Sequence, residues 1–184
     1  MDAIQCLKER RSVRAYKKEQ IKDEQLEIIL EAGKFAPTGM GMQSPIMVVV
    51  QDEATIKKLS EMNAAVMGVN TDPFYGAPTV IIVLADADRP TYVEDGSLVM
   101  GNLMNAAYAV GVDSCWIHRA REVFASDEGK ALLKKWGVEG NYVGIGHCIL
   151  GYRENALPSP KPRKENYVYD VVHEGNFDGG KRAQ

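Results

Sequence analysis

The hydrophobic positions along the chain fall into helical and strand-like stretches. Helical spacing, or an acid or serine that can begin a helix, predicts helices at 2–10, 23–35, 53–67, 95–110 and 126–136. Runs rich in apolar residues predict four strands at 46–50, 79–85, 114–118 and 142–150. We expect the first two strands to be buried on both faces, because their apolar residues do not alternate with polar ones. This helix-led order, without a repeat or an interior linker, predicts one α+β domain over residues 1–184.

Two segments do not fit this pattern. The first is a loop bounded by prolines, with two glycines and two methionines between them: Pro37, Gly39, Met40, Gly41, Met42 and Pro45. The second is the C-terminal part from about residue 155, which is basic and rich in proline and therefore predicts an extended arm. Within it, residues 166–172 alternate like a strand. We expect this arm to wrap the domain or to reach a second subunit.

Composition and charge narrow the class of protein. The chain has 184 residues, 45% of them hydrophobic and 26% charged, with a net charge of −3. These values are ordinary for a globular protein, and they argue against one that coats nucleic acid. No apolar run approaches the ~20 residues that span a bilayer, and the N-terminus lacks a signal-peptide core. Three cysteines without CxxC spacing make a disulfide framework improbable, so we expect a cytoplasmic protein.

Two basic clusters stand near opposite ends of the chain. Residues 10–14 contain three arginines and a serine, and residues 161–164 contain Lys161, Arg163 and Lys164. Guanidinium groups offer paired donors that match phosphate oxygens. The clusters can share one phosphate only if the fold brings the two ends together. The alternative is that both are solvated surface charge.

Several common sites are missing from the sequence. There is no GxxxxGK[ST] loop for a nucleoside triphosphate and no GxSxG nucleophile. The glycines Gly144 and Gly146 lie inside a strand pattern, which disfavours a dinucleotide fingerprint. His147 and Cys148 are adjacent on a predicted strand and face opposite sides, so we expect buried thiols and no metal site. No paired carboxylates suggest acid–base catalysis.

The remaining features fit a flat, phosphorylated ligand. They combine a basic anchor, glycines that allow close backbone approach, methionines that form adaptable walls, and Trp116 in a short strand. A flavin mononucleotide would use all of them. A nucleoside monophosphate or a phosphosugar would use fewer, and both stay open at this point.

The chain resembles the FMN-dependent nitroreductases of the small homodimeric kind. The resemblance runs through nearly the whole length and rests on the order and spacing of several motifs. They are RRSVR at 10–14, APTG at 36–39 with Gln43, APTVIIV at 77–83, GVDSC at 111–115, GIGHCILGY at 144–152 and KPR at 161–163.

This resemblance implies a set of cofactor-binding residues. Arg10, Ser12, Lys161 and Arg163 would bind the flavin phosphate with help from Arg11, and Arg14 would lie near the pyrimidine of the ring. The other subunit would cover the flavin with a second set: Pro37, Thr38, Gly39 and Gln43. Asn63 matches an amide that contacts the ring, and a strand end would face flavin N5 with Trp116, Ile117, His118 and Arg119. Met40 and Met42 would line the substrate cleft.

The resemblance also implies an architecture and an activity. The fold would have three layers, with a central, mostly antiparallel sheet between helices and a C-terminal arm exchanged between the subunits of a homodimer. NADH or NADPH would reduce FMN, which then reduces an electron-poor small molecule such as a nitroaromatic or a quinone in a ping-pong cycle. The flavin carries the chemistry, so no catalytic side chain is assigned, and neither a membrane nor nucleic acid is an expected partner.

One departure from the family pattern limits this inference. Many relatives have Glu-Gly where this chain has His118 and Arg119. Arg119 would attract an anionic substrate or the nicotinamide phosphate, or else be an ordinary surface arginine. The alternatives in function are a specialised member (a dehalogenase, a flavin-fragmenting enzyme or an ene reductase) and a protein that stores or senses FMN without turnover.

Overall fold

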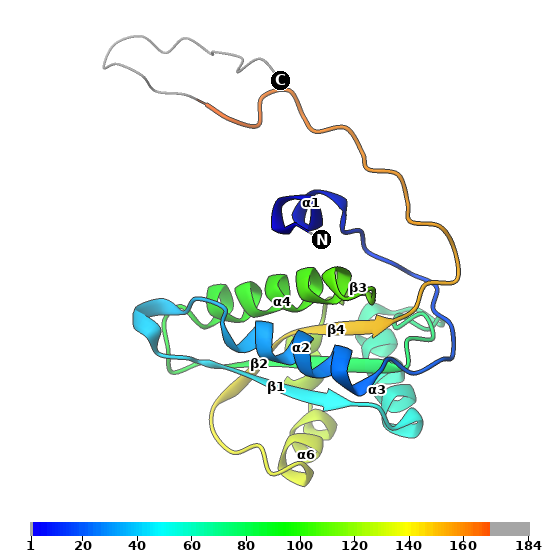
Figure 1. Ribbon diagram of the computed structural model, residues 1–184. Coiled ribbons are helices and arrows are strands. Elements are labelled where there is room, and N and C mark those ends of the chain that lie inside the picture. Colours follow the sequence, from blue (N-terminus) through cyan, green and yellow to red (C-terminus); the bar gives the residue numbers. More distant parts are fainter. Residues whose placement is uncertain (1, 170–184) are drawn as a thin grey trace.

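Four antiparallel strands form the centre of the protein (Figure 1). The structure is a computed structural model, and it describes residues 2–169. The strands are β1 (Pro45–Val50), β2 (Thr79–Asp86), β3 (Asp113–Ile117) and β4 (Tyr142–Gly151), in the order β1-β2-β4-β3. Each neighbouring pair is antiparallel, as expected.

Helices cover both faces of this sheet. α2 and α4 pack on one face, and α3, α5 and α6 pack on the other, which gives three layers (Figure 1). α1 and a 3-10 turn, η1, complete the elements. Their bounds are α1 Ala3–Glu9, α2 Asp23–Lys34, η1 Gly39–Gly41, α3 Glu53–Met67, α4 Tyr92–Ala109, α5 Ala120–Ala125 and α6 Asp127–Lys135. The predicted α+β class is therefore confirmed.

The position of strand β2 explains why its apolar residues do not alternate with polar ones. Ile81 and Val83 belong to the core on the α2–α4 side, and Val80, Ile82 and Leu84 belong to the core on the opposite side. All five are fully buried. A strand in the middle of a sheet that is covered on both faces is apolar throughout.

The prediction that 46–50 is a fully buried strand was wrong. β1 is an edge strand, and only Val50 is buried, while Val49 is exposed and the other side chains are partly covered. Hydrophobic content alone does not distinguish a central strand from an edge strand, which pairs with a neighbour along only one of its two edges.

Two helices also differ from the sequence prediction. α4 begins at Tyr92, three residues before the predicted start, with Thr91 at the N-cap position. α5 was missed, since it has only six residues and ends at Ser126, the N-cap of α6. This short helix follows the end of β3 directly, so it helps to shape the strand end that contains His118 and Arg119.

The C-terminal segment leaves the domain after β4 as an extended chain (Figure 1). Residues 166–169 form no strand, and the rest of the predicted strand at 166–172 lies outside the described residues. Within residues 2–169, no helix is both long and apolar enough to cross a membrane.

Gly144 fixes α5 against the sheet. A β-carbon at this position of β4 would collide with the backbone carbonyl of Ala120, the first residue of α5. We therefore expect Gly144→Ala to lower the free energy of unfolding by about 1–3 kcal/mol, because backbone must move to make room. Urea unfolding checks this, with the exposed Lys130→Ala in α6 as a control expected to change stability by less than about 0.5 kcal/mol. A Gly144→Ala protein as stable as the wild type would contradict this account of the packing.

Candidate flavin site

The N-terminal basic cluster lies beside strand β3. Ser12 pairs with Ser114 in a parallel bridge, and the backbone N–H of Val13 donates to the carbonyl of Ser114 at 3.1 Å. Further along, Tyr16 pairs with Arg153 just beyond β4. Residues 10–14 therefore run along the same sheet edge as the strand that ends at Ile117. Two of the segments predicted to bind the cofactor are thus neighbours.

The three arginines of this cluster have different surroundings. Arg11 Nη1 donates to the carbonyls of Lys8 and Arg10 at 2.7 and 2.8 Å, so it satisfies carbonyls at the end of α1. Arg10 Nη1 and Arg11 Nε are buried and have no hydrogen-bond partner among the described residues. Arg14 is exposed. Buried, unpaired guanidinium donors are costly, and an anion held nearby offsets that cost. The donor set therefore fits a phosphate group.

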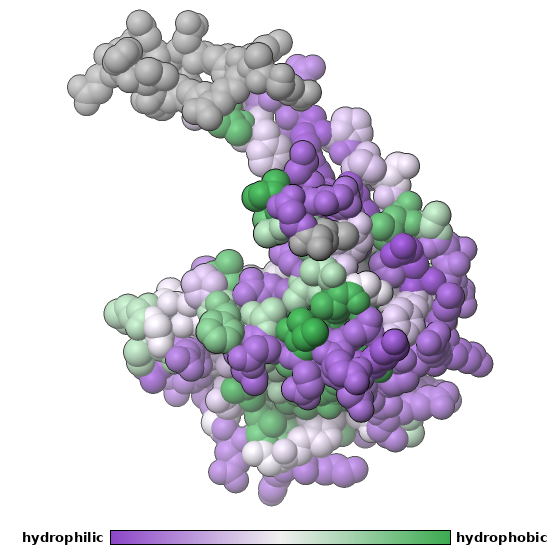
Figure 2. All heavy atoms as spheres, viewed as in Figure 1, coloured by the Kyte–Doolittle hydropathy of each residue, from purple (hydrophilic) through white to green (hydrophobic). Residues whose placement is uncertain are grey.

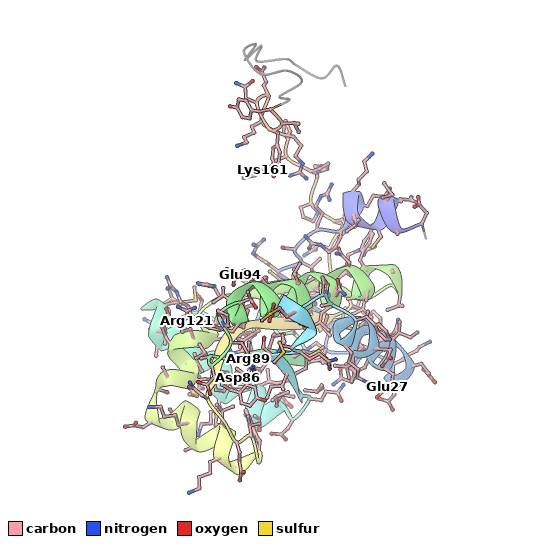
Figure 3. The ribbon with its side chains drawn as sticks, turned by 90° about the vertical axis from the view of Figure 1, so that its left-hand side faces the viewer. Glu27, Asp86, Arg89, Glu94, Arg121 and Lys161 are labelled. Atoms are coloured by element: carbon pink, nitrogen blue, oxygen red, sulfur yellow. The ribbon has the colours of Figure 1, made fainter. Side chains whose placement is uncertain are left out.

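The second basic cluster is not next to the first within one chain. Lys161 and Arg163 are exposed, and neither makes a hydrogen bond or an ion pair with any residue in 2–169. Figure 3 shows Lys161 on the extended arm, apart from the body of the domain. A phosphate clamp made of both clusters stays a prediction.

The end of β3 has an unusual backbone. Arg119 adopts left-handed angles, with φ 79° and ψ 9°, and caps the N-terminus of α5. For a residue with a β-carbon this conformation costs roughly 1–2 kcal/mol. The guanidinium of Arg119 pairs with Glu122 at 2.9 Å, and both side chains are about half exposed. Its charge is therefore partly matched by a neighbour before any substrate binds.

A buried pair of polar side chains, Asn63 and His147, lies next to this strand end. The Asn63 side chain in α3 is fully buried, and its Nδ2 donates to the His118 carbonyl at 2.9 Å and lies 3.3 Å from His147 Nδ1. His147 is fully buried between the rings of Phe74 and Phe124, and this burial lowers its pKa to about 3. Asn63 thus orients the backbone of His118, and its predicted contact with a flavin ring stays a prediction.

The predicted covering loop is strained and open. Met40 and Gln43 have φ values of 51° and 50°, and Met40 is 89% exposed. Met42, Gln43 and Pro37 are exposed too. The Thr38 hydroxyl accepts a hydrogen bond from the backbone N–H of Gln43 at 3.0 Å. Figure 2 shows apolar surface (green) over this end of the molecule, at the left.

The loop and the strand end belong to opposite edges of the sheet, because β1 and β3 are its two edge strands. Val48 of β1, Ile82 of β2, His147 of β4 and Ile117 of β3 form one line of paired residues. Three inter-strand spacings separate the ends of this line, or about 14 Å. The loop precedes β1, which is the edge strand furthest from β3. The structure places 10–14 beside Ser114 of β3, the strand that contains Trp116 and Ile117, whereas 37–43 precede the strand at the other edge.

An open cleft of about 1020 Å³ lies elsewhere, between residues 16–20, α3 and the turn before β2. None of the cofactor- or substrate-binding residues predicted from the sequence lines it. In 2–169, no group of three His, Cys, Asp or Glu side chains is arranged for a metal ion. Cys6, Cys115 and Cys148 are buried thiols, and burial raises the pKa of Cys148 to about 12.

Comparison with known proteins identifies the family. The family model described as "Nitroreductase family" matches residues 7–152. The chain belongs to the nitroreductase family. A "Putative NADH dehydrogenase/NAD(P)H nitroreductase" of Archaeoglobus fulgidus is 34% identical over 175 residues, which cover 90% of this chain and 91% of the relative.

Solved structures of other nitroreductases have the same fold. A nitroreductase of Bacteroides fragilis with bound FMN superposes with a TM-score of 0.85 and 29% identity, covering 93% of this chain and 99% of that one. An FMN-dependent nitroreductase of Clostridium difficile superposes with a TM-score of 0.81 and 26% identity, covering 94% and 98%.

Sequence reasoning missed one buried acid, Asp95, that holds the predicted covering loop of this nitroreductase family member. Asp95 is 2% exposed, and its carboxylate accepts hydrogen bonds from the Gly39 backbone and from the hydroxyls of Ser44 and Thr91. The available signal was an acidic pair, Glu94 and Asp95, at the start of a mostly apolar helical stretch. An acid in that pattern is buried only when donors surround it.

The buried His147 makes stability depend on pH. Its folded pKa is about 3, against 6.5 for an unperturbed histidine, so between these values only the unfolded chain binds the proton. We therefore expect His147 to cost up to about 1.4 kcal/mol of stability per pH unit as pH falls below 6.5. The His147→Gln variant removes this contribution, so its pH dependence, measured by denaturant titration from pH 7 to 4, should be shallower.

The exposed His118→Gln is the matched control, and its slope should equal that of the wild type. Equal slopes for the wild type and His147→Gln would show that His147 is protonated in the folded protein.

Proposed function

We propose that this protein is an FMN-dependent NAD(P)H oxidoreductase. The observation that carries the proposal is its likeness, over 93% of the chain, to a nitroreductase with bound FMN. When bound, FMN accepts hydride at N5 from NADH or NADPH and passes two electrons to an electron-poor acceptor in a ping-pong cycle. The protein's own residues bind the cofactor, orient it, tune it and exclude water.

One end of the site holds the phosphate. Arg10 and Ser12 donate to it from the segment beside β3, with Arg11 at the same end, and Lys161 and Arg163 close over it from the arm. The unpaired guanidinium nitrogens of Arg10 and Arg11 support this assignment. Because the arm of one chain extends away from its own domain, we infer that it reaches the site of a second copy.

The other end of the site faces the flavin ring. The backbone of residues 116–119 would line it and would offer a donor to N5, and Asn63 fixes that backbone through the His118 carbonyl. The exposed guanidinium of Arg14 would lie on the pyrimidine side, where it would favour the reduced, negatively charged ring. Arg119 is already paired with Glu122, so its pull on an anionic substrate is reduced.

A second copy supplies the cover over the ring. β1, which follows the loop, lies about 14 Å from β3, and this separation supports a site shared between two subunits. Exposed apolar side chains on the loop and on two helices provide a surface for that contact: Ile4, Leu7, Phe35, Met40, Met42 and Leu98. In the dimer, Met40 and Met42 form apolar walls for a nitroaromatic or quinone acceptor.

Reduction of bound FMN by a nicotinamide distinguishes an enzyme from a protein that only stores FMN. Purified protein loaded with FMN is mixed with NADH or NADPH without air, and the yellow absorption band is followed by stopped flow. We expect bleaching within seconds and recovery on addition of a quinone or a nitro compound. If the band persists with both nicotinamides while FMN stays bound, the protein binds FMN without turnover.

The phosphate anchor has its own test. Replacing both Arg10 and Arg163 by alanine removes charge-assisted hydrogen bonds, so the FMN dissociation constant should rise at least about 100-fold. Fluorescence titration with FMN measures it. The control Lys8→Ala with Lys164→Ala removes two charges from the same two segments and should change the constant less than about threefold. Equal effects in both double variants would mean that only net charge matters and that the phosphate lies elsewhere.

A further inference from the structure

Asp95 joins the two ends of the covering loop. It lies in the first turn of α4 and is almost completely buried. Its carboxylate accepts from the backbone N–H of Gly39 at 2.8 Å, at the start of the loop. It also accepts from the hydroxyl of Ser44 at 2.6 Å, at the end of the loop, and from Thr91 at 3.2 Å.

This carboxylate is charged although it is buried. Burial alone would raise its pKa, but the hydrogen bonds from Ser44, Gly39 and Thr91 outweigh that effect, and the pKa is lowered. No lysine, arginine or histidine within residues 2–169 forms an ion pair with it. The negative charge is therefore matched only by donors of the loop and of the helix start, so the loop is bound to it directly.

The loop needs such an anchor because its own geometry is unfavourable. Met40 and Gln43 hold left-handed backbone angles that non-glycine residues avoid. The Met40 side chain is 89% exposed and cannot hold the backbone by packing. Gly39 lies so close to Thr91 that a β-carbon there would collide with the threonine hydroxyl. Strain of this kind persists only where the surroundings enforce it, and it gathers at functional sites.

We propose that Asp95 is a positioning residue for the flavin: it clamps residues 39–44 in the strained shape that covers the cofactor of a second subunit. The inference rests on the proposed function. Asp95 does not touch the cofactor. It acts through Gly39 and Ser44, and its loss frees the loop while the phosphate anchor on the other chain stays intact.

Three variants separate positioning from mere stability. Asp95→Ala removes all three acceptor contacts. Asp95→Asn keeps an oxygen for the Gly39 N–H, and its amide can donate to the Ser44 hydroxyl, so it is the conservative rescue. Glu94→Ala is the matched control, because Glu94 precedes Asp95 in the same turn of α4, is exposed and has no hydrogen bond to the loop (Figure 3).

The measurements are the FMN dissociation constant and the quenching of flavin fluorescence by iodide, both at 20 °C, together with the melting temperature. We expect Asp95→Ala to raise the constant about tenfold, because the freed loop must then be ordered when it covers the flavin, and to increase quenching. Asp95→Asn should stay within about threefold of the wild type, and Glu94→Ala should match it. If Asp95→Ala does not fold, Ser44→Ala removes one donor and should show the same two changes to a smaller degree.

The outcomes are distinct. If the wild type binds no FMN, the proposed function fails, and this inference fails with it. If the wild type binds FMN but Asp95→Ala, or Ser44→Ala in its place, lowers only the melting temperature, then Asp95 merely stabilises the fold. In that second case the proposed function stands and the positioning role is overturned.

Discussion

The arrangement of the sheet sets the main constraint on this protein. An antiparallel sheet in the order β1-β2-β4-β3 keeps its two edge strands about three inter-strand spacings apart. One edge carries the N-terminal arginines and the end of β3, and the other begins at the loop that follows α2. Because β2 and β4 are buried and closely packed, the sheet cannot fold to bring these edges together. This separation of the two edges supports the proposal that a site using both halves is built from two copies of the chain.

Buried polar side chains hold the backbone of each half of the proposed site in position. Asn63 reaches from α3 to the carbonyl of His118, and Asp95 reaches from α4 to both ends of the loop. Each such group stabilises the fold only when its hydrogen-bond partners are in place, since an unpaired buried polar atom costs free energy. The backbone around them is strained at Met40, Gln43 and Arg119. Conformations of that kind are maintained by the surrounding structure, which here consists of a few specific hydrogen bonds.

Much of the fold could be predicted from sequence, for physical reasons. α3 was predicted with the correct bounds, because Asp52 caps it and Gly68 ends it in a left-handed conformation. The strong apolar run of β2 located the central strand. The edge position of β1 was missed, because burial depends on tertiary neighbours that the local pattern does not contain. α5 was too short to show a helical period.

The candidate site was predictable in part. The basic residues and the glycine-containing loop were visible as composition, and the resemblance to nitroreductases assigned their roles. The role of Asp95 depends on donors 4, 51 and 56 residues away, so no local pattern reveals it. The pairing of Arg119 with Glu122 and the burial of Asn63 also follow from the folded geometry alone.

The claim that each flavin site is shared between two chains can be tested directly by complementation. Arg10→Ala damages the phosphate half of the site, and Gly39→Val damages the covering half through its collision with Thr91. A heterodimer purified through two different affinity tags then contains one site with both defects and one intact site. We predict that each homodimer binds almost no FMN at micromolar concentration, whereas the heterodimer binds about one FMN per dimer. A heterodimer as empty of flavin as its parents would contradict the shared site.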